Sequence, residues 1–125
     1  MTRISLLIID DEAPIRKSLA NFLEDYEYDV TQVSSGEQAL SAIQRKSFDV
    51  AIVDLRLPGI NGEAFILRAG DIMPGLRYII HTGSVDYRIS SELMEMGVCA
   101  HQLFAKPIHD LQQFVTTIKL LLAKS

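Results

Sequence analysis

Apolar residues recur along this chain with two alternating periods, which predicts strands alternating with helices. Short continuous apolar runs are typical of strands buried on both faces, whereas apolar residues three and four apart mark one face of a helix. The runs predict five strands, at residues 4–9, 28–33, 48–53, 78–80 and 103–105. The helical spacing predicts five helices, whose apolar positions fall within 15–23, 39–43, 65–66, 89–96 and 111–122.

Local signals support several helix starts. Pro14 suits the first turn of the first helix. Ser35 and Gln38 have the spacing of a capping box at the second helix. Asn61 is placed to cap a short third helix after a Pro-Gly turn.

Strands alternating with helices predict an α/β fold with a doubly wound, five-stranded parallel sheet and helices on both faces. Right-handed crossovers restrict the topology. The strand order 2-1-3-4-5 puts the switch point between the first and third strands, where doubly wound sheets bind ligands. The second strand is more polar and is expected at an edge. With 125 residues, the chain is expected to form one domain over residues 1–125.

Four charged residues follow predicted strands. Asp10 and Asp11 end the first, Asp54 ends the third, and Lys106 follows the fifth. Each aspartate alone is also explained as a turn or cap residue, but together the four residues bring three carboxylates and one ammonium to one sheet edge. Carboxylates that lie so near to one another repel unless their charges are neutralised. Lys106 offsets one charge, and Mg²⁺, with Mn²⁺ as an alternative, suits the rest. A carboxylate in such a place can accept a phosphoryl group.

Composition excludes several classes of protein. The net charge of −4 argues against direct nucleic-acid binding. No apolar run approaches the roughly 20 residues of a membrane span, and no signal peptide is recognisable, so a cytoplasmic location is expected. Cys99, the single cysteine, excludes an internal disulfide and is expected in the core. The three histidines lack metal-ligand spacing, and His81 is expected to be a buried or loop residue.

Four motifs in this order, LLIIDDE, DLRLPGINGE, HTG and AKP, resemble the response-regulator receiver domain of two-component signalling, a CheY-like and flavodoxin-like fold. The resemblance covers essentially the whole chain. It implies that Asp54 is the phosphoacceptor and that Asp11, Asp54 and the backbone carbonyl of Arg56 bind Mg²⁺ directly. Asp10 would hold the ion through water.

The resemblance also implies roles around the phosphoryl group. Thr82 would hydrogen-bond the group, Lys106 would pair with its oxygens, and the bond between Lys106 and Pro107 would be cis. The donor would be a phosphohistidine on a sensor histidine kinase or phosphotransfer protein. The domain would be a signalling switch and no enzyme, although it takes part in its own phosphoryl transfer and dephosphorylation.

Two positions depart from the family pattern. An aromatic residue usually stands three positions before the lysine, where this chain has Leu103. Phe104 is adjacent, but on a strand its side chain faces the other way. The Gly-Ala that usually precedes this strand is Cys99-Ala100. The loop of residues 82–86 is therefore expected to move more than Leu103 does when the switch operates.

The output surface is expected on the fourth helix, fifth strand and fifth helix. A local charge change needs a movable element to amplify it, and the loop after Thr82 feeds the fourth helix. This face would meet a partner protein, an attached output domain, or a second copy in a phosphorylation-dependent homodimer. The residues expected on it are Tyr87, Arg88, Glu92, His101 and Lys119.

Two other functions share parts of this pattern. A flavodoxin-like cofactor binder would need a phosphate-cradling loop after the first strand, where the acidic residues 10–12 would instead repel phosphate. A Mg²⁺-dependent aspartyl-phosphate phosphohydrolase shares the metal and aspartate chemistry. Such enzymes typically carry Asp-x-Asp on the first strand, where this chain has Asp-Asp-Glu.

Overall fold

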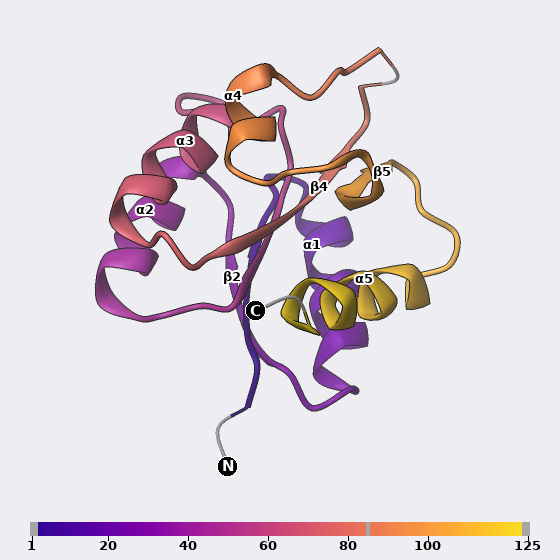
Figure 1. The fold of residues 1–125 in the computed structure, drawn as a ribbon. Coiled ribbons are helices and arrows are strands. Elements are labelled where there is room, and N and C mark those ends of the chain that lie inside the picture. The colour runs from indigo at the N-terminus through magenta and orange to yellow at the C-terminus, as the bar shows by residue number, and fades with distance from the viewer. Residues whose placement is uncertain (1–2, 85, 124–125) are drawn as a thin grey trace.

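The protein folds into a parallel sheet between two layers of helices (Figure 1). The computed structural model describes residues 3–84 and 86–123, so Val85, within the loop expected to move, lies outside the described residues. The sheet has the order β2-β1-β3-β4-β5, with every pairing parallel, which confirms the predicted fold class and strand order. The strands are β1 (Ser5–Ile9), β2 (Asp29–Val33), β3 (Val50–Val53), β4 (Arg77–Thr82) and β5 (Leu103–Ala105). The α-helices are α1 (Ala13–Glu24), α2 (Gly36–Arg45), α3 (Gly62–Ile72), α4 (Ser91–Glu95) and α5 (Gln112–Ala123).

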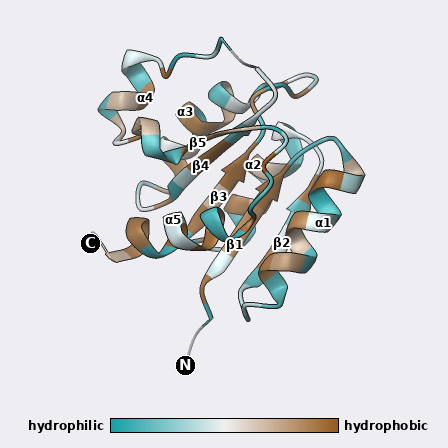
Figure 2. Ribbon diagram, turned by 90° about the vertical axis from the view of Figure 1, so that its right-hand side faces the viewer, coloured by the Kyte–Doolittle hydropathy of each residue, from teal (hydrophilic) through white to brown (hydrophobic). Residues whose placement is uncertain are grey.

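Each face of the sheet buries its own apolar cluster. Helices α1 and α5 cover one face, and α2, α3 and α4 cover the other (Figure 1). Every residue of β1 and β3 is buried, and these strands form the apolar centre of the molecule (Figure 2). Burying one Leu or Ile side chain contributes about 1.5–3 kcal/mol, so the two central strands anchor the sheet. No helix among the described residues is long and apolar enough to cross a membrane.

The predicted helix caps are present, with one change of partner. The Ser35 hydroxyl accepts a hydrogen bond from the Gln38 N–H, and Asn61 Oδ1 accepts one from the Ala64 N–H. The Gln38 side chain does not complete a capping box with Ser35, because its Oε1 accepts from the N–H of Ser34. Both helix starts are nevertheless satisfied by side-chain oxygens, as the sequence predicted.

The fourth helix is shorter than its apolar pattern predicts. It covers only Ser91–Glu95, capped by the Ser90 hydroxyl. Leu93 is its only buried residue, whereas Met94 and Met96 are exposed. The methionines therefore do not belong to the core, although their spacing suggested a helix face.

The prediction that Cys99 belongs to the core is wrong. Cys99 is exposed and precedes a short 3₁₀ helix, Ala100–Gln102, that the sequence did not indicate. Gln102 is buried in its place: its amide nitrogen donates to the Tyr78 carbonyl at 2.8 Å, and its amide oxygen accepts from the Cys99 N–H at 2.8 Å. Two backbone hydrogen bonds make burial of this polar side chain favourable.

Strand β4 runs two residues further than the apolar pattern predicts. His81 pairs with Phe104, and Thr82 with Ala105. Leu103 packs into the cluster under α2, α3 and α4, and Phe104 into the cluster under α1 and α5. The expectation that these neighbours face opposite ways is confirmed.

Two positions in the connection from β3 to α3 require glycine. Gly59 has a φ of +73°, a backbone region that favours glycine. A Cβ on Gly62 would lie 2.4 Å from the carbonyl oxygen of Asp54 and 2.7 Å from the Cα of Leu55. The start of α3 therefore packs directly against the backbone that carries Asp54.

Replacing Gly62 should destabilise the fold and disturb this loop. Gly62→Ala forces backbone atoms apart, so we expect a loss of about 1–3 kcal/mol in the free energy of unfolding, measured by urea denaturation. Gly75→Ala is the matched control, because nothing lies within 4 Å of a Cβ at that position. It should change stability by no more than about 0.5 kcal/mol. Equal effects of the two substitutions would contradict the packing argument.

Candidate functional site

The charged residues predicted at the strand ends meet at one edge of the sheet. The ladder holds their backbones in place: the Asp54 N–H donates to the Ile9 carbonyl at 2.9 Å, and the Lys106 N–H donates to the Thr82 carbonyl at 2.8 Å. Asp10 directly follows β1, beside Asp54. The parallel register thus brings three distant segments of chain together.

Lys106 lies at the centre of a cluster of carboxylates. Its Nζ is 2.9 Å from Asp10 Oδ2, 2.9 Å from Glu12 Oε1 and 3.1 Å from Asp54 Oδ2. Asp10 and Asp54 are buried, the lysine side chain is nearly so, and Glu12 is exposed. One ammonium faces three carboxylates, so the cluster keeps excess negative charge and can attract a further cation.

Burial and charge act in opposite directions on these groups. Burial alone would lower the pKa of Lys106, but its hydrogen bonds to Asp10, Glu12 and Asp54 outweigh this and raise that pKa. Burial raises the pKa of Asp54, against the lowering effect of the Lys106 bond and of the Arg56 N–H, while the charge of Asp10 adds to the increase. Lys106 is therefore a permanent cation at neutral pH, and Asp54 is a carboxylate in an unfavourable, dry position.

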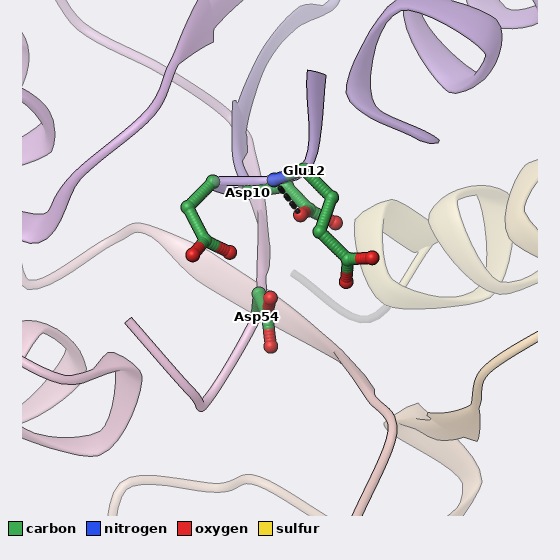
Figure 3. A group of neighbouring side chains, drawn as sticks. Asp10, Glu12 and Asp54 are labelled. Atoms are coloured by element: carbon green, nitrogen blue, oxygen red, sulfur yellow. Dashed lines mark hydrogen bonds between the residues drawn. The ribbon is translucent and has the colours of Figure 1, made fainter. Parts of the chain in front are cut away.

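Backbone donors fix the orientation of both buried aspartates. Asp10 Oδ1 accepts from the Glu12 N–H at 2.9 Å (Figure 3), and Asp54 Oδ1 accepts from the Arg56 N–H at 3.1 Å. Figure 3 shows Asp10 and Glu12 on the loop after β1, with Asp54 at the end of β3. The Arg16 guanidinium donates to the Asp10 carbonyl at 2.8 Å and so ties this loop to α1.

The acidic residues form a group that could hold a metal ion. Ligand atoms of Asp10, Asp11, Glu12 and Asp54 all lie within 4.8 Å of one another. Asp11 is exposed, which leaves its carboxylate open to an ion and its water ligands. An all-oxygen ligand set on one open side suits Mg²⁺. Glu12 was not predicted as a site residue, although its place directly after two aspartates was visible in the sequence.

Thr82 ends β4 at the same edge as the carboxylates. Its side chain is buried, and its hydroxyl oxygen accepts a hydrogen bond from the Ser84 N–H at 3.1 Å. The hydroxyl hydrogen is therefore still available to a new acceptor. The bond between Lys106 and Pro107 is cis.

His81 is buried between the site and helix α5, and neither ring nitrogen has a hydrogen-bond partner among the described residues. Its ring packs edge-on against Phe114 at 5.2 Å. Burial lowers the pKa of His81 to about 4, the charge of Lys106 adds to this, and Asp10 and Glu12 oppose it. Together with Lys106, Pro107 and residues of α1, His81 lines a mainly apolar cavity of about 340 Å³.

The sequence model of the response regulator receiver domain matches residues 6–119. The chain belongs to this family. Receiver domains are phosphorylation-based switches of two-component signalling, so the domain is a signalling switch.

Individual relatives agree with this assignment. The receiver domain is 30% identical to sporulation initiation phosphotransferase F of Bacillus subtilis over 95% of this chain and 94% of the relative. It is 33% identical to the transcriptional regulatory protein FixJ of Rhizobium meliloti over 88% of this chain, but spans only 53% of that protein. A CheY-like receiver domain of Methanospirillum hungatei superposes with a TM-score of 0.88 at 26% identity, over 98% of this chain and 96% of that one.

The residues expected on the output surface do not all face the same way. Tyr87 is half-buried, and its hydroxyl donates to Glu63 of α3 at 3.1 Å. Glu92 lines a cavity between α3 and α4. Arg88, Glu92, His101 and Lys119 are exposed. The receiver domain thus ties the loop before α4 to α3, a connection the sequence did not reveal.

His81 should make stability depend on pH. Its folded pKa of about 4 lies below the ordinary value of 6.5, so between these values the unfolded chain binds a proton that the folded protein does not. The stabilisation is complete above pH 6.5, and about 3 kcal/mol is lost as the pH falls to 4. Chemical denaturation of His81→Gln across this range should show a correspondingly smaller loss than wild type.

The control is His109→Gln, which removes an exposed histidine near the same cavity. It should keep the wild-type dependence on pH. The pH dependence is the decisive measurement, because an amide at position 81 also changes absolute stability. An unchanged dependence in His81→Gln would contradict the assignment.

Proposed function

We propose that this receiver domain accepts a phosphoryl group on Asp54 from a phosphohistidine on a sensor histidine kinase or phosphotransfer protein. The observation that carries the proposal is the buried Asp54 carboxylate, held 3.1 Å from Lys106 within a group of four acidic residues. An Asp54 oxygen would form the new bond to phosphorus as the donor's N–P bond breaks and its imidazole takes the electron pair. Phosphoryl transfer depends on such positioning and on neutralised charge.

Asp54 is favoured over the other carboxylates by its place. It is buried at the end of the central strand β3, so an acyl phosphate formed there would be shielded from water. Asp11 is exposed and follows the end of β1 by two residues, which suits a metal ligand better than an acceptor. Asp10 is buried and bonded in the same way as Asp54, by a backbone N–H and by Lys106, so the motif shared with the family is what assigns it a supporting role.

Mg²⁺ fits the acidic group, with Mn²⁺ as an alternative, because each available side-chain ligand is a carboxylate oxygen. Asp11, Asp54 and the Arg56 carbonyl would bind the ion directly, and Asp10 would do so through water. When bound, the ion supplies a second positive centre beside Lys106 for the oxygens of the transferring group. The Thr82 hydroxyl would donate to one of those oxygens, and Lys106 would pair with another.

The switch would be transmitted through the loop after Thr82. If Thr82 turns to the phosphoryl group, its bond to the Ser84 N–H is lost and the loop is released. Tyr87 then becomes the point that resists movement, because its hydroxyl is bonded to Glu63 of α3. The face of α4, β5 and α5 would change and meet a partner protein, an output domain or a second copy. The exposed thiol of Cys99 fits the reducing cytoplasm, where the encounter is proposed to occur.

The acceptor can be identified by chemical phosphorylation. With acetyl phosphate or phosphoramidate and Mg²⁺, one acid-labile and base-labile phosphoryl group should appear on Asp54. Intact mass and peptide mapping would locate it. Asp54→Asn should lose the label, and Asp49→Asn, at the opposite edge of the sheet, should keep it. Undiminished labelling of the same peptide in Asp54→Asn would refute the assignment.

Substitutions at Asp11 and Lys106 should move Mg²⁺ affinity in opposite directions. Asp11→Asn removes a direct ligand and one charge, so affinity should fall by about tenfold or more, and Asp10→Asn should have a milder effect. Lys106→Ala removes a competing cation, so affinity should stay equal or rise while phosphorylation slows. Titration at fixed ionic strength measures all three. Equal affinity in Asp11→Asn and wild type would exclude the proposed ligand set.

Beryllofluoride, a phosphoryl mimic, should shift backbone amides on α4, β5 and α5 as well as around Asp54. Tyr87→Phe removes a hydrogen bond to Glu63 that contributes about 1 kcal/mol, so it should ease the loop's release and shift α4 amides toward their activated positions. Tyr26→Phe removes a tyrosine hydroxyl that follows α1 and donates to Gln112 of α5, and it should leave the α4 amides unchanged.

Two results would count against this route. Amide shifts confined to the Asp54 pocket would exclude the proposed output face. A large rotamer change at Leu103, with little change in the loop, would show that the leucine serves as the aromatic residue does elsewhere in the family.

A further inference from the structure

A second cavity, of about 400 Å³, lies between α3 and α4. Tyr78, near the start of β4, lines it, whereas Asp54 lies at the carboxyl ends of the strands. None of its lining residues belongs to the Asp54 site. The cavity is therefore a separate feature of the surface, and its chemistry can be considered alone.

Acidic and apolar side chains share the wall of this cavity. Asp71, Glu92 and Glu95 supply three carboxylates, and within residues 3–84 and 86–123 no lysine, arginine or histidine lines the cavity. Leu67 and Met96 supply apolar surface, and both are partly exposed to solvent. Of the six large apolar side chains exposed on the described residues, four lie on α3, α4 or directly after α4. Exposed apolar area gathered in this way marks an interaction site.

Tyr78 provides an independent sign of a missing partner. Its side chain is 97% buried, it lines the cavity, and its hydroxyl has no hydrogen-bond partner among the described residues. A buried hydroxyl without a partner is unfavourable by about 1–3 kcal/mol, so such groups are rare without a reason. A ligand in the cavity that accepts or donates a hydrogen bond would remove this penalty.

Met96 lines the same cavity as Tyr78. It lies against α3 at Gly70, where a Cβ would be only 2.6 Å from the methionine methyl group. Methionine has three rotatable bonds and adapts readily to a changed neighbour. The Met96 side chain can therefore adapt to an occupant of the cavity without a change in the backbone.

We propose that the cavity between α3 and α4 binds a short basic and apolar segment of a partner protein. A lysine or arginine would lie among Asp71, Glu92 and Glu95, and a neighbouring aliphatic side chain would cover Leu67 and Met96. Charge complementarity selects this occupant: three carboxylates repel nucleic acid and anionic lipid. A single metal ion is disfavoured, because only the acidic group around Asp54 has its ligand atoms close enough together among the described residues.

A peptide titration followed by backbone amide shifts tests the proposal. The probe is acetyl-Leu-Arg-Leu-Arg-amide, with acetyl-Leu-Glu-Leu-Glu-amide and spermidine as comparisons, all at 150 mM salt to screen general attraction. The basic peptide should bind with a dissociation constant of about 1 mM or lower and shift amides around Gly70 and Met96. Absence of these shifts, equal binding of the acidic peptide, or equal shifts with spermidine would overturn the proposal.

Two matched double variants distinguish binding at the cavity from general attraction to the protein's negative charge. Glu92→Gln with Glu95→Gln should weaken peptide binding by about tenfold. Glu24→Gln with Glu27→Gln removes the same charge from exposed positions at the end of α1 and should leave the affinity unchanged. Equal weakening by both pairs would show general electrostatic attraction and refute a specific site.

Tyr78→Phe tests the buried hydroxyl. Removing an unpartnered hydroxyl should leave the unbound protein equally or more stable. A loss of peptide affinity would therefore not be caused by unfolding. Peptide affinity should nevertheless fall by about threefold or more. Unchanged affinity would exclude a contact between the peptide and the Tyr78 hydroxyl. It would then contradict the proposal that the peptide enters the cavity.

Discussion

The contact between one ammonium and three carboxylates is the constraint on which the functional edge of this receiver domain depends. Lys106 reaches Asp10, Glu12 and Asp54 only because β1, β3 and β5 end at the same level of one parallel sheet. Without the lysine, the two buried aspartates would repel each other in a dry environment. Even with it, negative charge remains in excess. The edge is thus stable enough to fold and still able to gain from a cation.

That edge is supported by parts of the molecule that carry no charge. All the residues of β1 and β3 are buried, which fixes the strands beneath Asp10 and Asp54. Gly62 lets α3 start against the backbone of Asp54 itself. Precision at the site therefore comes from apolar packing and from close backbone contact, and the polar groups are placed by them.

Much of this could be read from the sequence, because the period of apolar residues and the charges at strand ends are local signals. They predicted the sheet and the residues that meet at its edge, and the strand order followed from the known topology of doubly wound folds. What they missed depends on contacts between distant segments. No residue near Gln102 in the sequence indicates that its amide bonds to the Tyr78 carbonyl. The apolar neighbours of Cys99 suggest a core position, but the residue is exposed. The length of α4 was overestimated because exposed methionines have the same spacing as buried ones, and the bond from Tyr87 to Glu63 spans 24 residues.

The position of Cys99 has a practical consequence. It is the single cysteine of the chain, its thiol is exposed, and its backbone N–H is held by a buried glutamine that is itself bonded to β4. A spin label or fluorophore could be attached there without first replacing any other cysteine. The label would be carried by a hydrogen-bonded segment of backbone between α4 and β5. With a second label on α1, the distance between the two labels could be measured in solution. A change in that distance would show how chemistry at the edge of the sheet moves the segment between α4 and β5 relative to α1.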